Sequence, residues 1–280
     1  MVAQAVPRSL VALRQEGGIA WRHLRSAVQG NASVRYAAVV VLGSLLVMLL
    51  LGLWAGVGAP SVIAYHFNLE RDRSAVEAYG YLMSGAATLF LARSWWRSGL
   101  LLYLALAALF GFVLFDDALQ YHERVARHVL VPGLGLQGFF GARPQDTGEL
   151  MAWTLAGSAL LVPFGLALRQ DAQGKLALGL VFAGLFSALV AFAVGVDMLH
   201  SVAGGSRAFA RWLGFVEDGG EIAVLALTAL TAFVLSRDPI GQPLSDDLVR
   251  RGLKARIRAR RREARDEQVR APARSADLHA

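Results

Sequence analysis

Residues 34–56 read VRYAAVVVLGSLLVMLLLGLWAG, and after Arg35 this stretch contains no charged side chain. A transmembrane α-helix needs about 20 consecutive apolar residues, so the stretch predicts a membrane-spanning helix. Further apolar runs of similar length follow along the chain. The predicted spans are residues 34–56, 75–92, 99–115, 150–168, 176–196 and 217–235. We therefore predict an all-α fold, a polytopic bundle of six transmembrane helices.

The composition supports a membrane protein and limits its chemistry. Hydrophobic residues make up 55% of the chain and charged residues 18%, a balance typical of a polytopic membrane protein. There are no cysteines, which excludes disulfides, thiolate nucleophiles, iron–sulfur ligation and cysteine zinc sites. Any bound metal would therefore be held by oxygen and imidazole ligands.

The distribution of Lys and Arg predicts the orientation. With both termini in the cytoplasm, 21 of the 28 Lys and Arg residues lie on the inner side and seven on the outer side. This asymmetry satisfies the positive-inside rule. We therefore predict that both termini are cytoplasmic and that the protein resides in an inner membrane of the bacterial type. The predicted organisation is a basic N-terminal arm (1–33), a six-span membrane domain (34–236) and a basic cytoplasmic tail (237–280).

Each basic extension has two interpretations. Residues 7–29 place arginines among leucines and a tryptophan, a pattern that suits a helix lying on the membrane surface; a solvated arm is the alternative. The tail contains 12 of the 28 Lys and Arg residues, which favours contact with anionic lipid head groups, and a simple solvated tail is again the alternative. We expect the lipid bilayer, and not nucleic acid, to be the partner.

Acidic and histidine residues gather at one end of the predicted spans. In the alternating topology this end faces outward. The residues are Glu77 on the second span, Asp116, Asp117, His122 and Glu123 after the third, Asp197 and His200 after the fifth, and Glu217, Asp218 and Glu221 on the sixth. Counting about 20 residues back from the inner ends of the second and sixth spans places Glu77 and Glu221 within the bilayer. Embedded ionisable groups are costly and indicate a functional site.

Spacing determines which of these groups can act together, because residues three or four apart share a face of a helix. Asp197 and His200 have this spacing, and so does Glu221 with both Asp218 and Glu217. On a continuous helix, one stripe would contain Asp116, Gln120, Glu123 and Arg127. His122 would point about 100° away from Glu123. His122 and Glu123 could therefore converge only if the helix loosened there.

Three interpretations of the cluster remain open. In the first, the cluster binds one or two divalent metal ions, zinc or iron, and its ligands are Asp116, Asp117, His122, Glu123, Asp197, His200, Glu217, Asp218 and Glu221. Glu123 or Glu221 then accepts a proton in a hydrolase or oxidase reaction. In the second, the carboxylates form a proton or cation pathway in which Glu77 and Glu221 are protonated. In the third, the acids pair with loop arginines and are structural. Eight carboxylates crowded at low dielectric require a cation or shared protons, which favours the first two.

The run from Phe115 to Glu123, FDDALQYHE, resembles the D-E-x-x-x-x-H-E box of a group of uncharacterised bacterial multi-pass membrane proteins. That group also carries an acid near the outer end of a later span and an E-E-x-x-E box opening the last one, to which Asp197 and residues 217–221 correspond. The resemblance covers most of residues 60–236. It implies topology and site residues, but no activity is established for the group.

The chain departs from that pattern at several positions. Asp stands where the pattern has Glu at 117, 197 and 218, which shortens the reach of three side chains. Gly219 and Gly220 also weaken the start of the last span, because glycine costs about 1 kcal/mol relative to alanine inside a helix. These changes indicate an altered site, a lost site, or a close approach between helices.

Overall fold

The computed structural model describes residues 8–69, 71, 73–138, 143–170, 174–196, 198–199 and 207–240, and every regular element within these ranges is helical. The elements are α1 (Arg8–Gly30), α2 (Ala32–Val57), α3 (Ser61–Phe67), α4 (Ala75–Ser98), α5 (Leu101–Leu119), α6 (Tyr121–Val125), η1 (Ala126–Leu130), α7 (Val131–Leu134), α8 (Pro144–Arg169), α9 (Lys175–Val190), η2 (Ala191–Val196) and α11 (Arg207–Arg237). The two η elements are π-helical. The predicted all-α fold class is confirmed.

Five helices of the described ranges are long and apolar enough to cross a membrane: α2, α5, α8, the continuous unit of α9 and η2, and α11. They coincide with five of the predicted spans, and the chain is a multi-pass membrane protein. The predicted second span coincides with α4, which has 24 residues and is therefore about 36 Å long at 1.5 Å per residue. It is not among the five helices that reach the hydropathy of a membrane span over sufficient length. A sixth span therefore stays a prediction.

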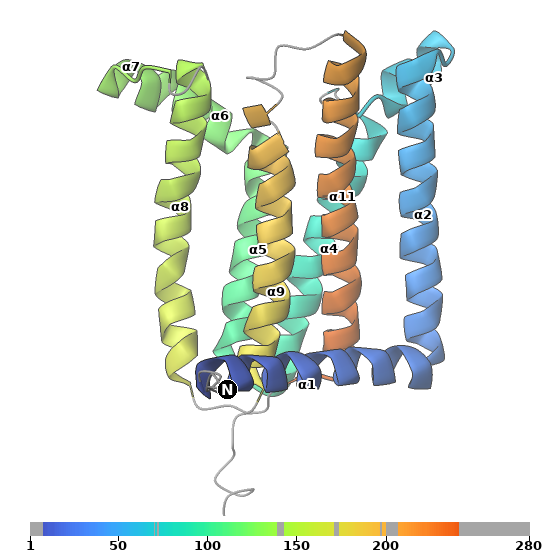
Figure 1. Ribbon diagram of the computed structural model, residues 1–280, viewed down its shortest axis with the longest axis vertical. Coiled ribbons are helices and arrows are strands. Elements are labelled where there is room, and N and C mark those ends of the chain that lie inside the picture. The colour runs from blue at the N-terminus through green and yellow to red at the C-terminus, as the bar shows by residue number, and fades with distance from the viewer. Residues whose placement is uncertain are drawn as a thin grey trace, which may run out of the picture.

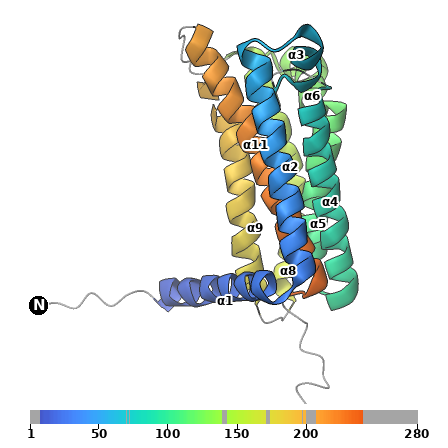
Figure 2. The ribbon, with the colours of Figure 1, turned by 90° about the vertical axis from the view of Figure 1, so that its right-hand side faces the viewer.

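The long helices run side by side, and α1 lies across one end of them (Figure 1). The view turned by 90° shows the same arrangement, with α1 roughly perpendicular to the bundle (Figure 2). The short helices α3, α6 and α7 lie at the opposite end of the bundle. The N-terminal extension thus includes a helix, and its position on a membrane surface stays a prediction.

The core of the bundle is formed by α4, α5 and α11. Residues from all three, including Leu91, Phe110 and Ala226, are fully buried. In the most apolar stretch of each helix, half of the residues of α5 and 61% of those of α11 are buried, against 11% in α2 and in α8. The helices α2 and α8 are therefore peripheral and turn most of their apolar surface outward. Because α4 packs most extensively against α5 and α11, it can tolerate more polar residues than a helix facing lipid.

At the end of the bundle next to α1, hydrogen bonds connect helices that are distant in the sequence. Arg97 near the end of α4 donates to the carbonyl of Arg237 at the end of α11, at 2.9 Å. Arg237 in turn donates to the hydroxyl of Ser33 at the start of α2, at 3.1 Å. The ring of His23 in α1 lies 2.8 Å from the carbonyl of Asp238. The helices α4 and α11 therefore run parallel, with their C-terminal ends together.

The glycines at the start of the last span allow close packing. A methyl group built on Gly220 would overlap the ring of Phe192 in η2. One built on Gly219 would lie 3.2 Å from Leu49 of α2. Of the three explanations that the sequence left open for these glycines, the close approach between helices is observed.

This packing predicts that Gly220→Ala is destabilising although alanine is the better helix former. Overpacking a core costs about 1–3 kcal/mol, which exceeds the gain of about 1 kcal/mol in helix propensity. Gly157→Ala on α8 is a matched control, because a methyl group there meets no atom within 4 Å. Thermal unfolding of the detergent-solubilised protein should give a lower midpoint for Gly220→Ala than for Gly157→Ala. Equal midpoints would contradict the close packing.

Candidate functional site

A cavity of about 230 Å³ lies at the end of the bundle opposite α1. We call it the acidic cavity because carboxylates from four elements reach it. Its ionisable lining residues are Arg71 in the loop before α4, Glu77 on α4, Asp117 on α5, His122 and Glu123 on α6, and Asp218 and Glu221 on α11. The predicted convergence of distant acids is thus observed for these residues.

A break in the chain after α5 positions the histidine. Gln120 adopts a left-handed conformation with φ of 50°, which ends α5 and starts α6 in a new direction. His122 turns back toward Asp116, which is fully buried. The carboxylate of Asp116 accepts a hydrogen bond from the backbone N–H of His122 at 2.9 Å, and its other oxygen lies 2.7 Å from His122 Nδ1. The predicted single stripe through Gln120 is therefore wrong, because the helix is not continuous there.

His122 and Glu123 both follow the break at Gln120 and lie within the α-helical turn of α6, so their convergence on one ion stays a prediction. Both residues line the acidic cavity from α6, which has only five residues before the chain passes into the π-helical η1. Glu123 also lies 3.6 Å from Arg127, one turn further on. This contact agrees with the interpretation in which acids pair with arginines, but it is largely exposed, so it contributes little to stability.

The charge state of His122 is set by its surroundings. Burial favours the neutral imidazole, but the hydrogen bond and the negative charge of Asp116, followed by the charges of Glu149 and Glu123, outweigh it. The result is a pKa of His122 above its ordinary value of 6.5. With Nδ1 facing Asp116, the other ring nitrogen, Nε2, is the atom available to exchange a proton or bind a ligand.

Glu77 is fixed at the first turn of α4. The hydroxyl of Ser74 caps the helix by accepting a hydrogen bond from the backbone N–H of Glu77 at 3.1 Å. The Glu77 carboxylate accepts hydrogen bonds from the backbone N–H of Arg73 and from the hydroxyl of Tyr81. Tyr81 also lies 3.3 Å from the carbonyl oxygen of Asp117, so it links the acid on α4 to α5.

The acids on α11 reach the cavity because α4 and α11 touch at small residues. A methyl group built on Gly80 would lie 3.5 Å from Ile222 and 3.7 Å from Leu225, so this part of α4 is at the level of residues 222–225. Asp218 and Glu221 line the cavity on this side. Glu217, the third acid of the predicted box, is not among the lining residues.

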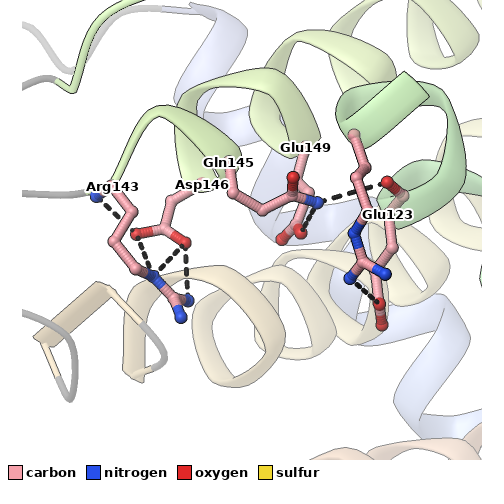
Figure 3. Close-up of polar contacts among 6 residues, drawn as sticks. Glu123, Arg143, Gln145, Asp146 and Glu149 are labelled. Atoms are coloured by element: carbon pink, nitrogen blue, oxygen red, sulfur yellow. Dashed lines mark hydrogen bonds and ion pairs between the residues drawn. The ribbon is translucent and has the colours of Figure 1, made fainter. Parts of the chain in front are cut away.

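A second group of polar residues supports α6 from the side. Figure 3 shows Gln145 between Glu149 and Glu123: its amide donates to the carboxylate of Glu149 at 2.8 Å and to the carbonyl of Glu123 at 3.2 Å. Nearby, Arg143 and Asp146 form an ion pair at the start of α8, at 2.7 Å. The hydrogen bond from Gln145 to Glu123 connects α8 to α6, and the ion pair stabilises the start of α8.

Tyr81, Arg71 and Glu149 are not among the site residues that the sequence predicts. Tyr81 could have been found, since it lies one helical turn after Glu77 and shares its face. Arg71 and Glu149 gave no comparable signal. Arg71 belongs to a loop, and Glu149 approaches His122 only because α6 departs from the direction of α5.

The predicted metal ligands are only partly brought together. Within the ranges that the structure describes, no group of three or more His, Asp and Glu side chains is arranged to hold a metal ion. Asp116 contacts His122 instead of facing the cavity. Asp197 and His200 lie outside the described residues, so their predicted roles stay predictions.

Comparison with known protein families gives a match over most of the chain. A family model described as "Domain of unknown function (DUF8692)" matches residues 40–236. No curated protein and no solved structure matches the chain. The matched region includes every helix that lines the acidic cavity, while the resemblance to proteins with a D-E-x-x-x-x-H-E box stays a prediction.

The pairing of Asp116 with His122 predicts the effect of Asp116→Asn. Removing this negative charge should lower the pKa of His122, which NMR of histidine-labelled protein in nanodiscs would measure. Asp146→Asn is the control, because Asp146 is not among the groups that shift the pKa of His122. An unchanged His122 pKa in Asp116→Asn would contradict the pairing.

The same pairing predicts a pH dependence of stability. Because the folded-state pKa of His122 is raised, its protonation stabilises the fold fully below the unfolded-state value of about 6.5. This stabilisation is lost as the pH rises through the higher folded-state pKa. Thermal unfolding across this range should show a smaller loss for Asp116→Asn than for the parent.

Proposed function

The chain belongs to the family described as a domain of unknown function (DUF8692), and from its geometry we propose that it binds cations, protons among them, in the acidic cavity and couples them to transport across the membrane. The observation that carries this proposal is the composition of the cavity lining. Five carboxylates line one space of about 230 Å³ together with Arg71 and His122, and His122 is already paired with Asp116.

Electrostatics explains why such a cavity binds cations. Carboxylates close together at low dielectric either raise one another's pKa until they share protons or bind a positive ion. Four of these five acids come from α4, α5 and α11, the three helices of the core, and Glu123 comes from α6. A change in occupancy of the cavity would therefore act directly on the packing of the helices that hold the bundle together.

A row of polar residues continues from the cavity along α4. Glu77, Tyr81, Ser84 and Thr88 are spaced by four, three and four residues, so they share one face of the helix. Ser84 is fully buried, and its hydroxyl oxygen has no hydrogen-bond partner among the described residues. Such a group costs about 1–3 kcal/mol when unsatisfied, so it is a suitable place for a water molecule or a passing proton. This row favours transport over chemistry confined to one surface.

The proposal includes a topology. We take α4 as the sixth span, with both termini in the cytoplasm and the acidic cavity facing outward in an inner membrane. The excess of Lys and Arg on the side of the termini supports this orientation. In this arrangement α1 lies along the inner leaflet, and the basic tail contacts anionic lipid head groups there.

A metal-dependent hydrolase or oxidase is the second candidate, and one observation favours it. Metal-bound histidines commonly direct their other ring nitrogen to a carboxylate, as His122 does with Asp116. Zinc or iron bound at His122 Nε2 would activate water, and Glu123 or Glu221 would accept its proton. This candidate ranks second because the described residues include no group of three assembled ligands.

Flux measurements in liposomes test the transport function. We expect the purified protein to carry protons in exchange for sodium, reported by an entrapped pH-sensitive dye under a sodium gradient. Glu77→Gln and Glu221→Gln, which keep the side-chain size and remove the charge, should reduce the flux to background. Asp146→Asn, which removes a carboxylate at the same end of the bundle but outside the cavity, should retain it.

Metal analysis of the same preparations separates the candidates. Stoichiometric zinc or iron that is lost in His122→Ala, in a protein without proton flux, would replace the transport function with the enzymatic one. Protein with neither flux nor metal would overturn both, and the acidic cluster would then be structural.

A further inference from the structure

A second cavity of about 470 Å³ lies next to the acidic cavity, between α2 and the start of α11. We call it the lateral groove. Its lining includes Gly52 and Gly56 on α2, Leu69 in the loop before α4, and Arg211, Trp212 and Phe215 on α11. The groove thus lies between two helices that are membrane-spanning candidates.

The two cavities share one lining residue among the described residues, Leu69. This residue is 8% exposed. It packs directly against Gly52 of α2, where no larger residue would fit beside it, and it approaches Gly219 of α11. Leu69 therefore lies at the boundary between the lateral groove and the acidic cavity.

The lateral groove is apolar with a cation at its rim. Trp212 and Val57 among its lining residues are exposed and give it an apolar, open side. The guanidinium group of Arg211 reaches across the groove and donates a hydrogen bond to the carbonyl of Gly56 at 3.3 Å. A positive charge therefore lies in the groove, and behind Leu69 lies the concentrated negative charge of the acidic cavity.

We propose that the lateral groove binds an aminophospholipid, with its phosphate at Arg211 and its ammonium group directed past Leu69 toward the acidic cavity. The order of the charges carries the inference: apolar surface, then a cation, then carboxylates, which complements acyl chains, phosphate and ammonium in turn. Arginine binds phosphate oxygens through paired N–H groups. This inference rests on the proposed function, since it names the lipid ammonium group as a cation that the acidic cavity receives.

The chemistry of the head group predicts which class of phospholipid binds best. Phosphatidylglycerol offers the phosphate but no cation for the carboxylates. Phosphatidylcholine offers a cation without N–H donors, so it cannot donate hydrogen bonds to Glu77 or Glu221. Phosphatidylethanolamine has both the charge and the donors, so we expect the protein to prefer it.

Native mass spectrometry tests this preference. The protein is reconstituted in nanodiscs of phosphatidylethanolamine, phosphatidylglycerol and phosphatidylcholine in equal amounts, and the lipids retained after release are counted. We expect phosphatidylethanolamine to be retained above the other two. Arg211→Gln should reduce this retention about tenfold, as for loss of a charge-assisted hydrogen bond. Glu221→Gln should keep phospholipid binding but lose the preference for phosphatidylethanolamine over phosphatidylcholine.

Two glycine variants provide the matched control. Gly56→Leu should fill the lateral groove without disturbing the fold, because the space beside Gly56 is open, and it should abolish selective retention. Gly157→Leu on α8, whose surroundings are equally open, should leave retention unchanged. Equal retention of the three lipids, or no difference between the two variants, would overturn the inference.

The lipid-retention experiment and the flux experiment test the two proposals separately. Proton flux without a preference for phosphatidylethanolamine would overturn the lipid site and leave cation transport standing. Selective lipid retention without flux would support the lipid site and overturn the transport step.

Discussion

The buried carboxylate of Asp116 is the group on which the geometry of the site depends. A fully buried carboxylate must be hydrogen-bonded, and here both oxygens are bonded by His122, to the backbone N–H and to the ring. Residues six apart cannot meet in this way on a continuous α-helix, so the bond requires the left-handed turn at Gln120. That turn directs α6 across the end of the bundle, where Glu123 joins the acids of α4, α5 and α11 around one cavity.

The two ends of the bundle differ in chemistry, so the proposed cation site lies at one end only. At one end, hydrogen bonds join Arg97 of α4 to Arg237 of α11 and Arg237 to the start of α2, and His23 of α1 contacts the carbonyl of Asp238. At the other, the acidic cavity and the lateral groove meet at Leu69. A cation that enters from the membrane or from water at the acidic end would meet carboxylates on the core helices, with polar residues of α4 continuing inward.

Much of the fold could be predicted because apolar length is a direct physical requirement of a membrane span. The helix α4 shows the limit of this signal: enclosure by α5 and α11 lets it carry Glu77 and two arginines. The gathering of Glu77 and Glu221 could be predicted from alternating topology, since both lie near span ends on the same side. The pairing of Asp116 with His122 could not, because no glycine or proline marks the turn at Gln120 and a continuous helix was assumed. Likewise, the sequence left three explanations open for Gly220, and only the position of Phe192 decided between them.

Cross-linking between α4 and α11 tests most directly whether acids of different helices share one outward-facing cavity. Because the chain has no cysteine, Glu77→Cys with Glu221→Cys introduces a single reactive pair. A short bifunctional thiol reagent that cannot cross membranes should join the pair when it is added outside intact cells. Glu77→Cys with Val39→Cys, which places the second thiol near the α1 end of α2, should remain unlinked. Failure of the first pair to react, or equal reaction of both pairs, would contradict the account.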